Sequence, residues 1–387
     1  MTIVGSYYAA LLPAVTACLA VVASLALKGR TLPLSLILEG FSGYGKTAVL
    51  QMFFALALEP FIYRSDKFSP KSFVSHAANV KRQELSKIDM LPRLKNKVLT
   101  TKELATMFRG REDELTETFA QLCTVLDGKG LTTDSGMQGQ RGYKKYIVFN
   151  WLGATTPVPA ETHALMYQLG TRLLFFEVAS IPPTRAELFS YMEQDRSNEA
   201  EEETKKAVTF LLLEFFRQHP VSSVEPNSVV IPQKLLMELA CWAELLAAGR
   251  AKIIYERSNG TAIPVAANPP EAAYKIAQYF MLLARGSALI QGRSEVDASD
   301  VDMVAHVAVS SIPGYLRPII RLFRKAARVD STSAAALCGV SAPTARKYLK
   351  ELSLLGFGTL RKGDIKTNTP DTLTRAPAYS WLNGSRP

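Results

Sequence analysis

The sequence predicts an α/β fold: a mainly parallel sheet between two layers of helices (an αβα sandwich), followed by a helical block and a small basic domain. Three observations support this class. Residues 34–38 form an apolar run with the length of a buried strand, and an apolar helical run, 48–58, follows a glycine-rich loop. Runs with high strand propensity recur at 97–101 and 146–152. From residue 207 onward, apolar residues recur at helical spacing.

Length and composition allow several folded domains. The chain has 387 residues, of which 48% are hydrophobic and 21% are charged, which is typical of globular proteins rather than disordered ones. We expect three domains, covering residues 1–180, 181–313 and 314–387. The formal net charge is +10, and the last domain alone holds 13 Lys or Arg against 4 Asp or Glu. Such a basic domain favours a polyanion as its partner, although a solvated basic surface is the alternative.

The loop after the first strand carries the strongest motif. Gly40, Gly45, Lys46 and Thr47 match G-x-x-x-x-G-K-[ST], and the strand and helix that this motif requires flank it. The glycines of such a loop let backbone N–H groups approach phosphate oxygens, Lys46 reaches the β- and γ-phosphates, and Thr47 ligates Mg²⁺. We therefore expect ATP and Mg²⁺ as cofactors. The predicted nucleotide-binding residues are Gly40, Ser42, Gly43, Tyr44, Gly45, Lys46, Thr47 and Ala48.

With these elements the chain resembles AAA+ P-loop ATPases, nearest in style to their MCM-like and phage or plasmid helicase branches. The resemblance implies an acid at the end of a later strand, which activates the attacking water. The usual Asp-Glu pair after an apolar strand is absent. Two candidates for the catalytic base are Glu103, which follows the run 97–101, and Asp127, which ends a second β-prone run, 122–126. Glu103 is favoured because it has the interval from the loop that the resemblance implies.

The resemblance also implies residues that sense or neutralise the γ-phosphate. Thr155 or Thr156, after the strand 146–152, would take the sensor-1 position. Arg172 lies in a segment similar to the one that carries the arginine finger, a role that requires an oligomer, in ring form. The block after residue 207 is similar to an AAA+ lid, and its sensor-2 position would fall on Lys275 or, alternatively, on Arg285. For each residue, an ordinary surface or turn position is the other interpretation.

Two regions are candidates for contact with DNA. The loop 135–145 is rich in glycine and basic residues, and loops of this kind suit a DNA channel, although a plain hairpin is an equal alternative. Its candidate contacts are Arg141, Lys144 and Lys145.

The second region is the tail, which begins with a basic amphipathic helix at 316–328. Two short helices around Gly339–Val340 follow, and Ser341 is placed to cap the second helix. The tail resembles a winged helix, with a basic wing hairpin formed by residues 358–366 and 378–382, and a protein-binding winged helix is the alternative. Its candidate DNA contacts are Arg346, Lys347, Lys350, Arg361 and Lys362.

Residues 3–27 carry no charge and are long enough to span a membrane. We instead expect a helix packed on the sheet, without stable membrane insertion, because the run is rich in Ala, Thr, Ser and Gly and lies close to the first strand. The four cysteines are widely spaced, so neither zinc nor a disulfide framework is indicated, and a cytoplasmic location is expected. The charged run 193–206 is expected to be a solvated helix face or a mobile loop.

These expectations combine into one leading hypothesis and two alternatives. The leading hypothesis is an oligomeric ATP-hydrolysing DNA motor or replication ATPase, helicase-like in type. The first alternative is an ATP-gated DNA-binding regulator or loader with slow hydrolysis. The second is a scaffold that ATP stabilises and whose winged helix binds protein.

Overall fold

The computed structural model describes residues 1–75, 84–135, 139–168, 170–179, 182–194, 197–258, 260–364 and 369–383. The chain divides into two compact units. Unit 1 comprises residues 1–159, 172–231 and 281–303, and unit 2 comprises residues 160–171, 232–280 and 304–387. Because each unit draws on separate stretches of the chain, the three contiguous domains stay a prediction.

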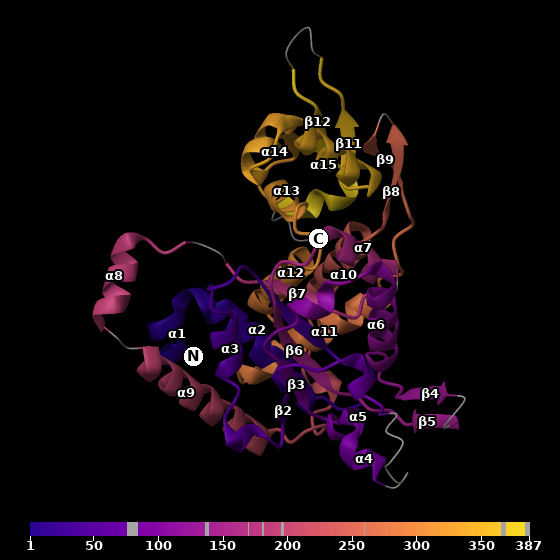
Figure 1. The fold of residues 1–387 in the computed structure, drawn as a ribbon. Coiled ribbons are helices and arrows are strands. Elements are labelled where there is room, and N and C mark those ends of the chain that lie inside the picture. Colours follow the sequence, from indigo (N-terminus) through magenta and orange to yellow (C-terminus); the bar gives the residue numbers. More distant parts are fainter. Residues whose placement is uncertain are drawn as a thin grey trace. The chain divides into compact units, whose positions relative to one another are not determined.

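A five-stranded parallel sheet forms the centre of unit 1, in the order β2-β3-β6-β1-β7 (Figure 1). Every residue of β1, β3 and β6 is buried, as is typical of parallel strands that are covered on both faces, and the polar residues among them lie at the strand ends. This confirms the predicted α/β class with a central parallel sheet. The strands are β1 (Ser35–Glu39), β2 (Ile62–Arg64), β3 (Val98–Thr101), β6 (Asn150–Thr155) and β7 (Leu174–Glu177).

Short helices connect the strands of the sheet, and α3 packs against β6. Their bounds are α3 (Lys46–Gln51), η3 (Leu56–Leu58), η4 (Pro70–Ser72), α4 (Leu85–Ile88), α5 (Met90–Arg93), η5 (Ala105–Phe108) and α6 (Glu112–Val125). An antiparallel hairpin, β4 (Leu131–Ser135) and β5 (Gly139–Tyr143), stands between α6 and β6 in the chain. The remaining elements of unit 1 include α8 (Arg185–Gln194), α9 (Ser197–Gln218) and η6 (Pro226–Ser228).

The apolar N-terminal segment is helical and packs on the sheet. It consists of α1 (Thr2–Tyr8), η1 (Ala9–Leu11), α2 (Leu12–Ala23) and η2 (Ser24–Ala26), and α2 contacts β1 and β6. By length and composition alone, Thr2–Ala26 is apolar enough to cross a membrane, but 67% of its most apolar window is buried inside the protein. The expected packing of this helix on the sheet is therefore what the structure has.

Asn150 fixes this helical segment to the sheet. The side chain is fully buried at the start of β6. Its Oδ1 accepts hydrogen bonds from Leu34 N at 3.1 Å and Arg30 Nη1 at 3.2 Å, while its Nδ2 donates to Val21 O at 2.7 Å and Ser24 Oγ at 2.8 Å. One amide thus joins α2, η2 and the segment before β1, with every hydrogen-bonding position in use.

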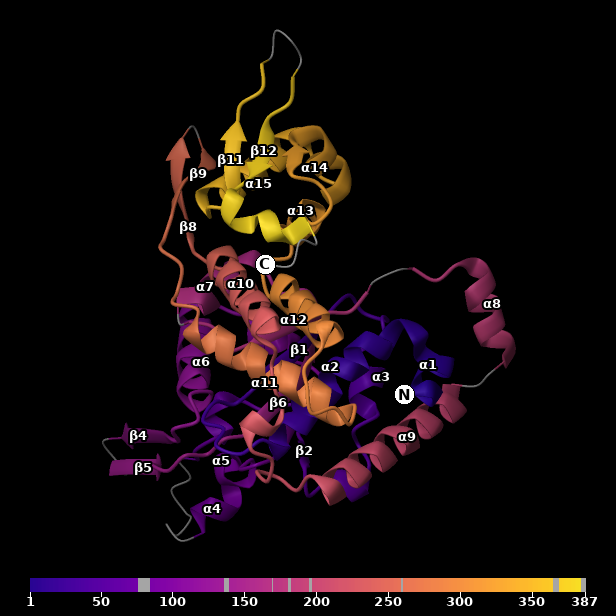
Figure 2. The same ribbon diagram turned by 180° about the vertical axis from the view of Figure 1, so that it is seen from behind.

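Unit 2 contains helices from the predicted lid and the whole basic tail (Figure 2). Its elements are α7 (Ala160–Gln168), α10 (Gln233–Gly249), β8 (Ile253–Ser258), β9 (Thr261–Ala267), α13 (Arg317–Phe323), β10 (Arg328–Asp330), α14 (Ser331–Cys338), α15 (Ala342–Leu354), β11 (Gly358–Arg361), β12 (Thr372–Arg375) and η7 (Pro377–Asn383). The division between the units falls within α11 (Tyr274–Ile290) and α12 (Ala298–Ser310).

Within the tail, α14 and α15 meet at Gly339, whose φ of +63° is the left-handed conformation that glycine tolerates best. β10, which precedes α14, joins β11 and β12, which follow α15, in a three-stranded antiparallel sheet of order β10-β12-β11. The wing strand expected at 378–382 is wrong, because these residues lie in η7 and β12 pairs with β11 instead. Ser341 caps α15 as expected, by accepting a hydrogen bond from Thr344 N. The basic helix expected at 316–328 is shorter, since α13 ends at Phe323 and the chain then enters β10.

One difference from the sequence prediction bears directly on the site. The run 122–126 belongs to helix α6 and not to a strand. Leu122 and Val125 continue the buried face that Leu115 and Phe119 begin, which is the three- and four-residue spacing of a helix. Asp127 therefore follows a helix, and its expected place at a strand tip is wrong.

Other boundaries also shifted. The helix expected at 48–58 is divided into α3 and η3, and the strand expected at 146–152 begins only at Asn150. Asp297 caps α12, because its Oδ1 accepts a hydrogen bond from Ser299 N at 2.8 Å. Residues 197–206 of the charged run lie in α9, where Lys205 and Lys206 pair with glutamates three residues earlier, so the helix-face alternative is correct there.

Candidate functional site

The loop 40–47 joins β1 to α3 at the carboxyl edge of the sheet. Gly43 and Gly45 have φ values of +85° and +80°, which side chains other than glycine rarely adopt. A Cβ atom at Gly45 would also lie 2.5 Å from a methyl carbon of Leu11 in η1, so the Leu11 side chain would have to move to admit one. Ser42, Gly43 and Thr47 are exposed, and the loop therefore offers backbone groups and a hydroxyl at the surface.

Lys46 is the first residue of α3 and is largely buried. Its Nζ donates a hydrogen bond of 2.6 Å to the carbonyl oxygen of Phe41, within the same loop. Burial lowers the pKa of Lys46, and the negative charge of Glu103 opposes that shift. The ammonium therefore lies inside the loop and within electrostatic reach of the carboxylate that was predicted as the base.

Glu103 follows β3, two strands from β1 in the sheet. Its Oε1 accepts a hydrogen bond from Ala105 N at 2.8 Å, and its side chain is exposed. The next residue, Leu104, donates its backbone N–H to Ala154 O at 2.9 Å, which holds this turn beside the end of β6. Glu103 thus lies at the same sheet edge as the loop, and Asp127 does not follow a strand of that sheet.

Asp127 and Arg172, both candidates for catalytic roles, lie together. Arg172 Nε is 2.9 Å from Asp127 Oδ1, and the two side chains are 12% and 33% exposed. An ion pair this shielded holds both groups in place more firmly than a surface pair does. The arginine-finger role of Arg172 stays a prediction, and in this structure its guanidinium is engaged within its own chain.

The two sensor-1 candidates stand at the end of β6. Thr155 is buried, donates its hydroxyl to Thr156 O at 3.0 Å, and its own carbonyl accepts from Gly40 N at 3.3 Å. Thr156 Oγ1 accepts a hydrogen bond from Arg109 Nη2 at 3.4 Å. Sequence reasoning missed Arg109, which is a cation beside the end of β6. Arg109 reaches Thr156 only because the chain that follows β3 folds back toward the end of β6.

The two sensor-2 candidates differ in their surroundings. Lys275 is in the first turn of α11 and belongs to unit 2, whereas the phosphate loop belongs to unit 1. Arg285 is half-buried and donates from Nε to Val229 O at 3.2 Å, and burial lowers the pKa of its guanidinium. Neither role is tested by these contacts.

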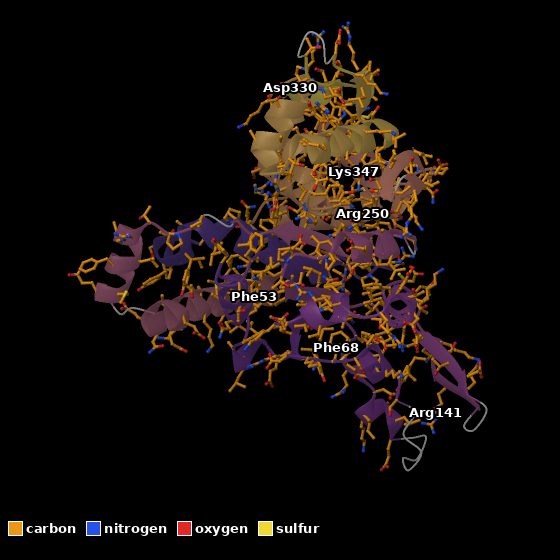
Figure 3. All side chains as sticks on the ribbon, turned by 45° about the horizontal axis from the view of Figure 1, so that its top comes forward. Phe53, Phe68, Arg141, Arg250, Asp330 and Lys347 are labelled. Carbon is orange, nitrogen blue, oxygen red and sulfur yellow. The ribbon has the colours of Figure 1, made fainter. Side chains whose placement is uncertain are left out.

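The β4–β5 hairpin carries the candidate DNA contacts of unit 1 (Figure 3). Arg141, labelled there, donates from Nη1 to Ser75 O at 3.3 Å, and Tyr143 donates from its hydroxyl to Asp89 Oδ2 at 2.7 Å. Lys144 and Lys145 are exposed. Residues 136–138 of the predicted loop lie outside the described residues. Of the two alternatives, the hairpin is present, and binding to DNA stays a prediction.

A hairpin that sequence reasoning missed lies beside α15 in unit 2 (Figures 1 and 2). Lys347, labelled in Figure 3, lies 4.8 Å from the ring centroid of Tyr255 in β8, and Tyr255 donates its hydroxyl to Glu351 Oε1 at 2.9 Å. Burial raises the pKa of Glu351. The alternating residues 253–267 around Asn259-Gly260 are the sequence signal that would have predicted this hairpin.

The remaining candidate DNA contacts of the tail lie on α15 and at β11. Arg346 is exposed and Lys350 is partly exposed, four residues apart and so on one face of α15. Arg361 and Lys362, at the end of β11, are both exposed. Residues 365–368 of the predicted wing lie outside the described part of the chain.

The donor groups at the phosphate loop fit Mg²⁺ and a nucleotide. Mg²⁺ prefers oxygen ligands and keeps several waters, so the exposed Thr47 hydroxyl beside substrate phosphates suffices as a protein ligand. Among the described residues, no group of three or more His, Cys, Asp or Glu is placed to hold a metal ion by itself. Any metal at this site would therefore be bound together with the phosphates.

Comparisons with known proteins assign this chain to no family. No protein-family model and no curated protein matches the sequence. The chain is similar to a crystal structure described as a "putative ATPase" from Cytophaga hutchinsonii, with a TM-score of 0.42 and 12% identity, covering 80% of this chain and 84% of that one. A likeness at this level carries no argument about activity. What the chain itself supports is a mixed α/β fold whose central parallel sheet fits a P-loop NTPase.

Proposed function

We propose that this chain is an ATP-hydrolysing P-loop ATPase of the AAA+ type that acts on DNA as an oligomer. The observation that carries the proposal is the loop 40–47. It follows a buried strand in the middle of a parallel sheet, two of its glycines have positive φ, and Lys46 opens the next helix. Ligands of open parallel sheets bind at this carboxyl edge.

In the proposed mechanism, backbone N–H groups of residues 42–47 cradle the phosphates of ATP. Lys46 exchanges the carbonyl of Phe41 for phosphate oxygens, and Thr47 contributes its hydroxyl to Mg²⁺. Mg²⁺, when bound, neutralises charge on the phosphates. Glu103 accepts the proton of the attacking water, and the hydroxyl of Thr156 with Arg109 lies at the adjacent strand end.

Glu103→Gln is expected to lower the ATP turnover rate by about 100-fold or more while ATP binding persists, because the amide cannot accept the proton. Asp127→Asn is its matched control, since it removes the other candidate carboxylate and leaves the sheet edge intact. Steady-state phosphate release and binding of a fluorescent ATP analogue would be measured for both. If Asp127→Asn were the inactive variant and Glu103→Gln retained activity, the assignment of the base would be reversed.

The proposal includes DNA as the partner of the tail, interpreted as a winged helix. Its basic charge supports this interpretation, and so does the order of helices and strands, in which α14 and α15 are followed by the β11–β12 hairpin. The contact between Tyr255 and Lys347 places part of α15 against protein. We therefore propose that Arg346 and Lys350 contact DNA phosphates more than Lys347 does.

Joint replacement of Arg346 and Lys350 by alanine is expected to weaken duplex binding, and to reduce the slope of log K against log[salt] by about 1 for each phosphate that the variant no longer neutralises. Lys347→Ala is expected to change the slope less. Fluorescence anisotropy at several salt concentrations measures both, with the exposed Lys234→Ala as control. Equal effects of all three variants would contradict a specific role for α15.

One observation beside Glu103, the candidate catalytic base, favours a second candidate function. Lys102 occupies the position before Glu103, where an acid is usual, and its Nζ lies 3.8 Å from Asp66 and 5.1 Å from the centroid of the Phe54 ring. A lysine here does not assist Mg²⁺, which favours an ATP-gated regulator or loader with slow hydrolysis. ATPase rates with and without DNA, measured beside oligomer mass with and without ATP, separate the two: a motor requires DNA-stimulated turnover.

A further inference from the structure

A basic, hydroxyl-rich cavity lies on unit 1, outside the phosphate loop. It has a volume of about 450 Å³ and is lined in part by Lys67, Lys71 and Arg93. Four serines contribute to the same lining, namely Ser65, Ser69, Ser72 and Ser75. No acidic residue lines it in the described part of the chain, and none of the three cations makes an ion pair there. Concentrated positive charge with hydroxyl donors is a setting that selects phosphate groups.

Arg93 is held in a fixed orientation at this cavity. Its Nε donates to Asp89 O at 3.1 Å and its Nη2 donates to Ile88 O at 3.0 Å. Its guanidinium also lies 5.3 Å from the centroid of the Tyr63 ring. These contacts fix the guanidinium through Nε and Nη2, and among the described residues no carboxylate forms an ion pair with it, so its positive charge is held in place at the cavity. The nearby Asp66 is engaged by Arg64 instead, at 3.0 Å.

The wall of the cavity is tied to the β4–β5 hairpin. The buried Asp89 accepts Ser75 N at 2.7 Å through Oδ1 and the Tyr143 hydroxyl at 2.7 Å through Oδ2. Arg141 reaches the carbonyl of the same Ser75. One carboxylate therefore sets the spacing between the cavity and the hairpin whose exposed lysines are Lys144 and Lys145.

The cavity continues toward the candidate base. A second cavity of about 220 Å³ shares Lys67, Phe68 and Ser69 with the first and is lined also by Arg109 and Glu103. Phe68, labelled in Figure 3, has its ring centroid 5.5 Å from that of Trp151 and 5.4 Å from that of Phe73. This shared wall is therefore anchored in the core. Glu103 and Glu114 accompany Arg109 in this second cavity, so the wholly basic lining belongs to the first cavity, where Lys67, Lys71 and Arg93 offer more positive charge than a single phosphate group requires.

From this arrangement we propose that Lys67, Lys71 and Arg93 bind the phosphodiester backbone of a single nucleic-acid strand. The inference rests on the proposed function for its choice of nucleic acid as the source of phosphate. The aromatic side chains of Tyr63 and Phe68 in the lining favour a strand over a bare anion, because bases stack on such rings.

The test is binding of a fluorescein-labelled oligothymidine strand by the full chain, followed by anisotropy at several salt concentrations. Lys71→Ala with Arg93→Ala is expected to raise Kd by about tenfold and to reduce the salt slope by about 0.7 for each phosphate that is no longer neutralised. Arg93→Lys keeps the charge and is expected to keep the slope while losing part of the affinity. Lys95→Ala, exposed but not in the lining, is the matched control.

The same substitutions are repeated in a chain that carries Arg346→Ala and Lys350→Ala, so that binding by the tail cannot hide the effect. Basal ATPase activity is expected to be unchanged, because neither Lys71 nor Arg93 belongs to the phosphate loop. If the unaltered chain bound duplex DNA but no single strand, only the present inference would fail, and if it bound neither, the DNA partner in the proposed function would fail as well. If it bound the single strand and the cavity variants matched Lys95→Ala, only the present inference would fail. Displacement of the strand by deoxythymidine monophosphate or inorganic phosphate at equal phosphate concentration would also overturn it, in favour of a small-anion site.

Discussion

Replacing Lys46 by alanine is expected to abolish ATP hydrolysis, with a loss of about 100-fold or more, and to weaken ATP binding. The ammonium is the one charge that the loop 40–47 brings to the phosphates, and charge stabilisation at transferring phosphoryl groups contributes several kcal/mol in a site sheltered from water. Isothermal titration calorimetry with ATP and steady-state phosphate release measure the two effects separately.

The fold should survive this substitution. Lys46 is buried with a lowered pKa, so its removal relieves a desolvated ammonium and costs only the hydrogen bond to Phe41 O. Thermal unfolding of the variant should therefore stay close to that of the unaltered chain, and the exposed Lys95→Ala serves as the control for activity. ATP affinity unchanged by Lys46→Ala would show that the loop is not the nucleotide site.

Asn150→Ala is expected to destabilise the protein by about 3 kcal/mol. The substitution leaves the buried Leu34 N–H without its partner, and such an orphaned group costs about 1–3 kcal/mol. It also removes one of two hydrogen bonds to the Val21 carbonyl, which still accepts from Ser24 Oγ at 2.8 Å. Because Asn150 links α2 to β1 and β6, the loss falls on the centre of unit 1. Chemical denaturation followed by circular dichroism measures the change in free energy of unfolding.

Two controls separate the amide network from a general effect of truncation. Ser24→Ala removes only one of the four partners and is expected to cost about 1 kcal/mol. Asn227→Ala, at an exposed position, is expected to stay within about 0.5 kcal/mol of the unaltered chain. A cost at Asn150 no larger than that at Ser24 would mean that water or a backbone shift replaces the missing hydrogen bonds.

The candidate acids show where sequence reasoning stops. The runs before Glu103 and Asp127 look alike over five residues, because a short apolar run does not distinguish a strand from one face of a helix. Placement in the sheet decides between them: β3 pairs with β6, whereas residues 122–125 complete the buried face of α6. The same limitation hid Arg109, whose proximity to Thr156 depends on contact between segments 47 residues apart.

The sequence by itself determined the features whose residues are neighbours along the chain. The sequence predicted the loop 40–47 with its flanking strand and helix, and also the two helices around Gly339. Backbone conformation at these places depends on neighbouring residues and on glycine. Only the tertiary structure decided the rest. The tertiary structure packs the apolar N-terminal segment on the sheet through Asn150, and it brings Tyr255 into contact with Lys347. It also forms the ion pair between Asp127 and Arg172. Finally, it places Lys67, Lys71 and Arg93 in the lining of one cavity. Each of these depends on side chains brought together from separate segments, and residue spacing along the chain does not encode such distances.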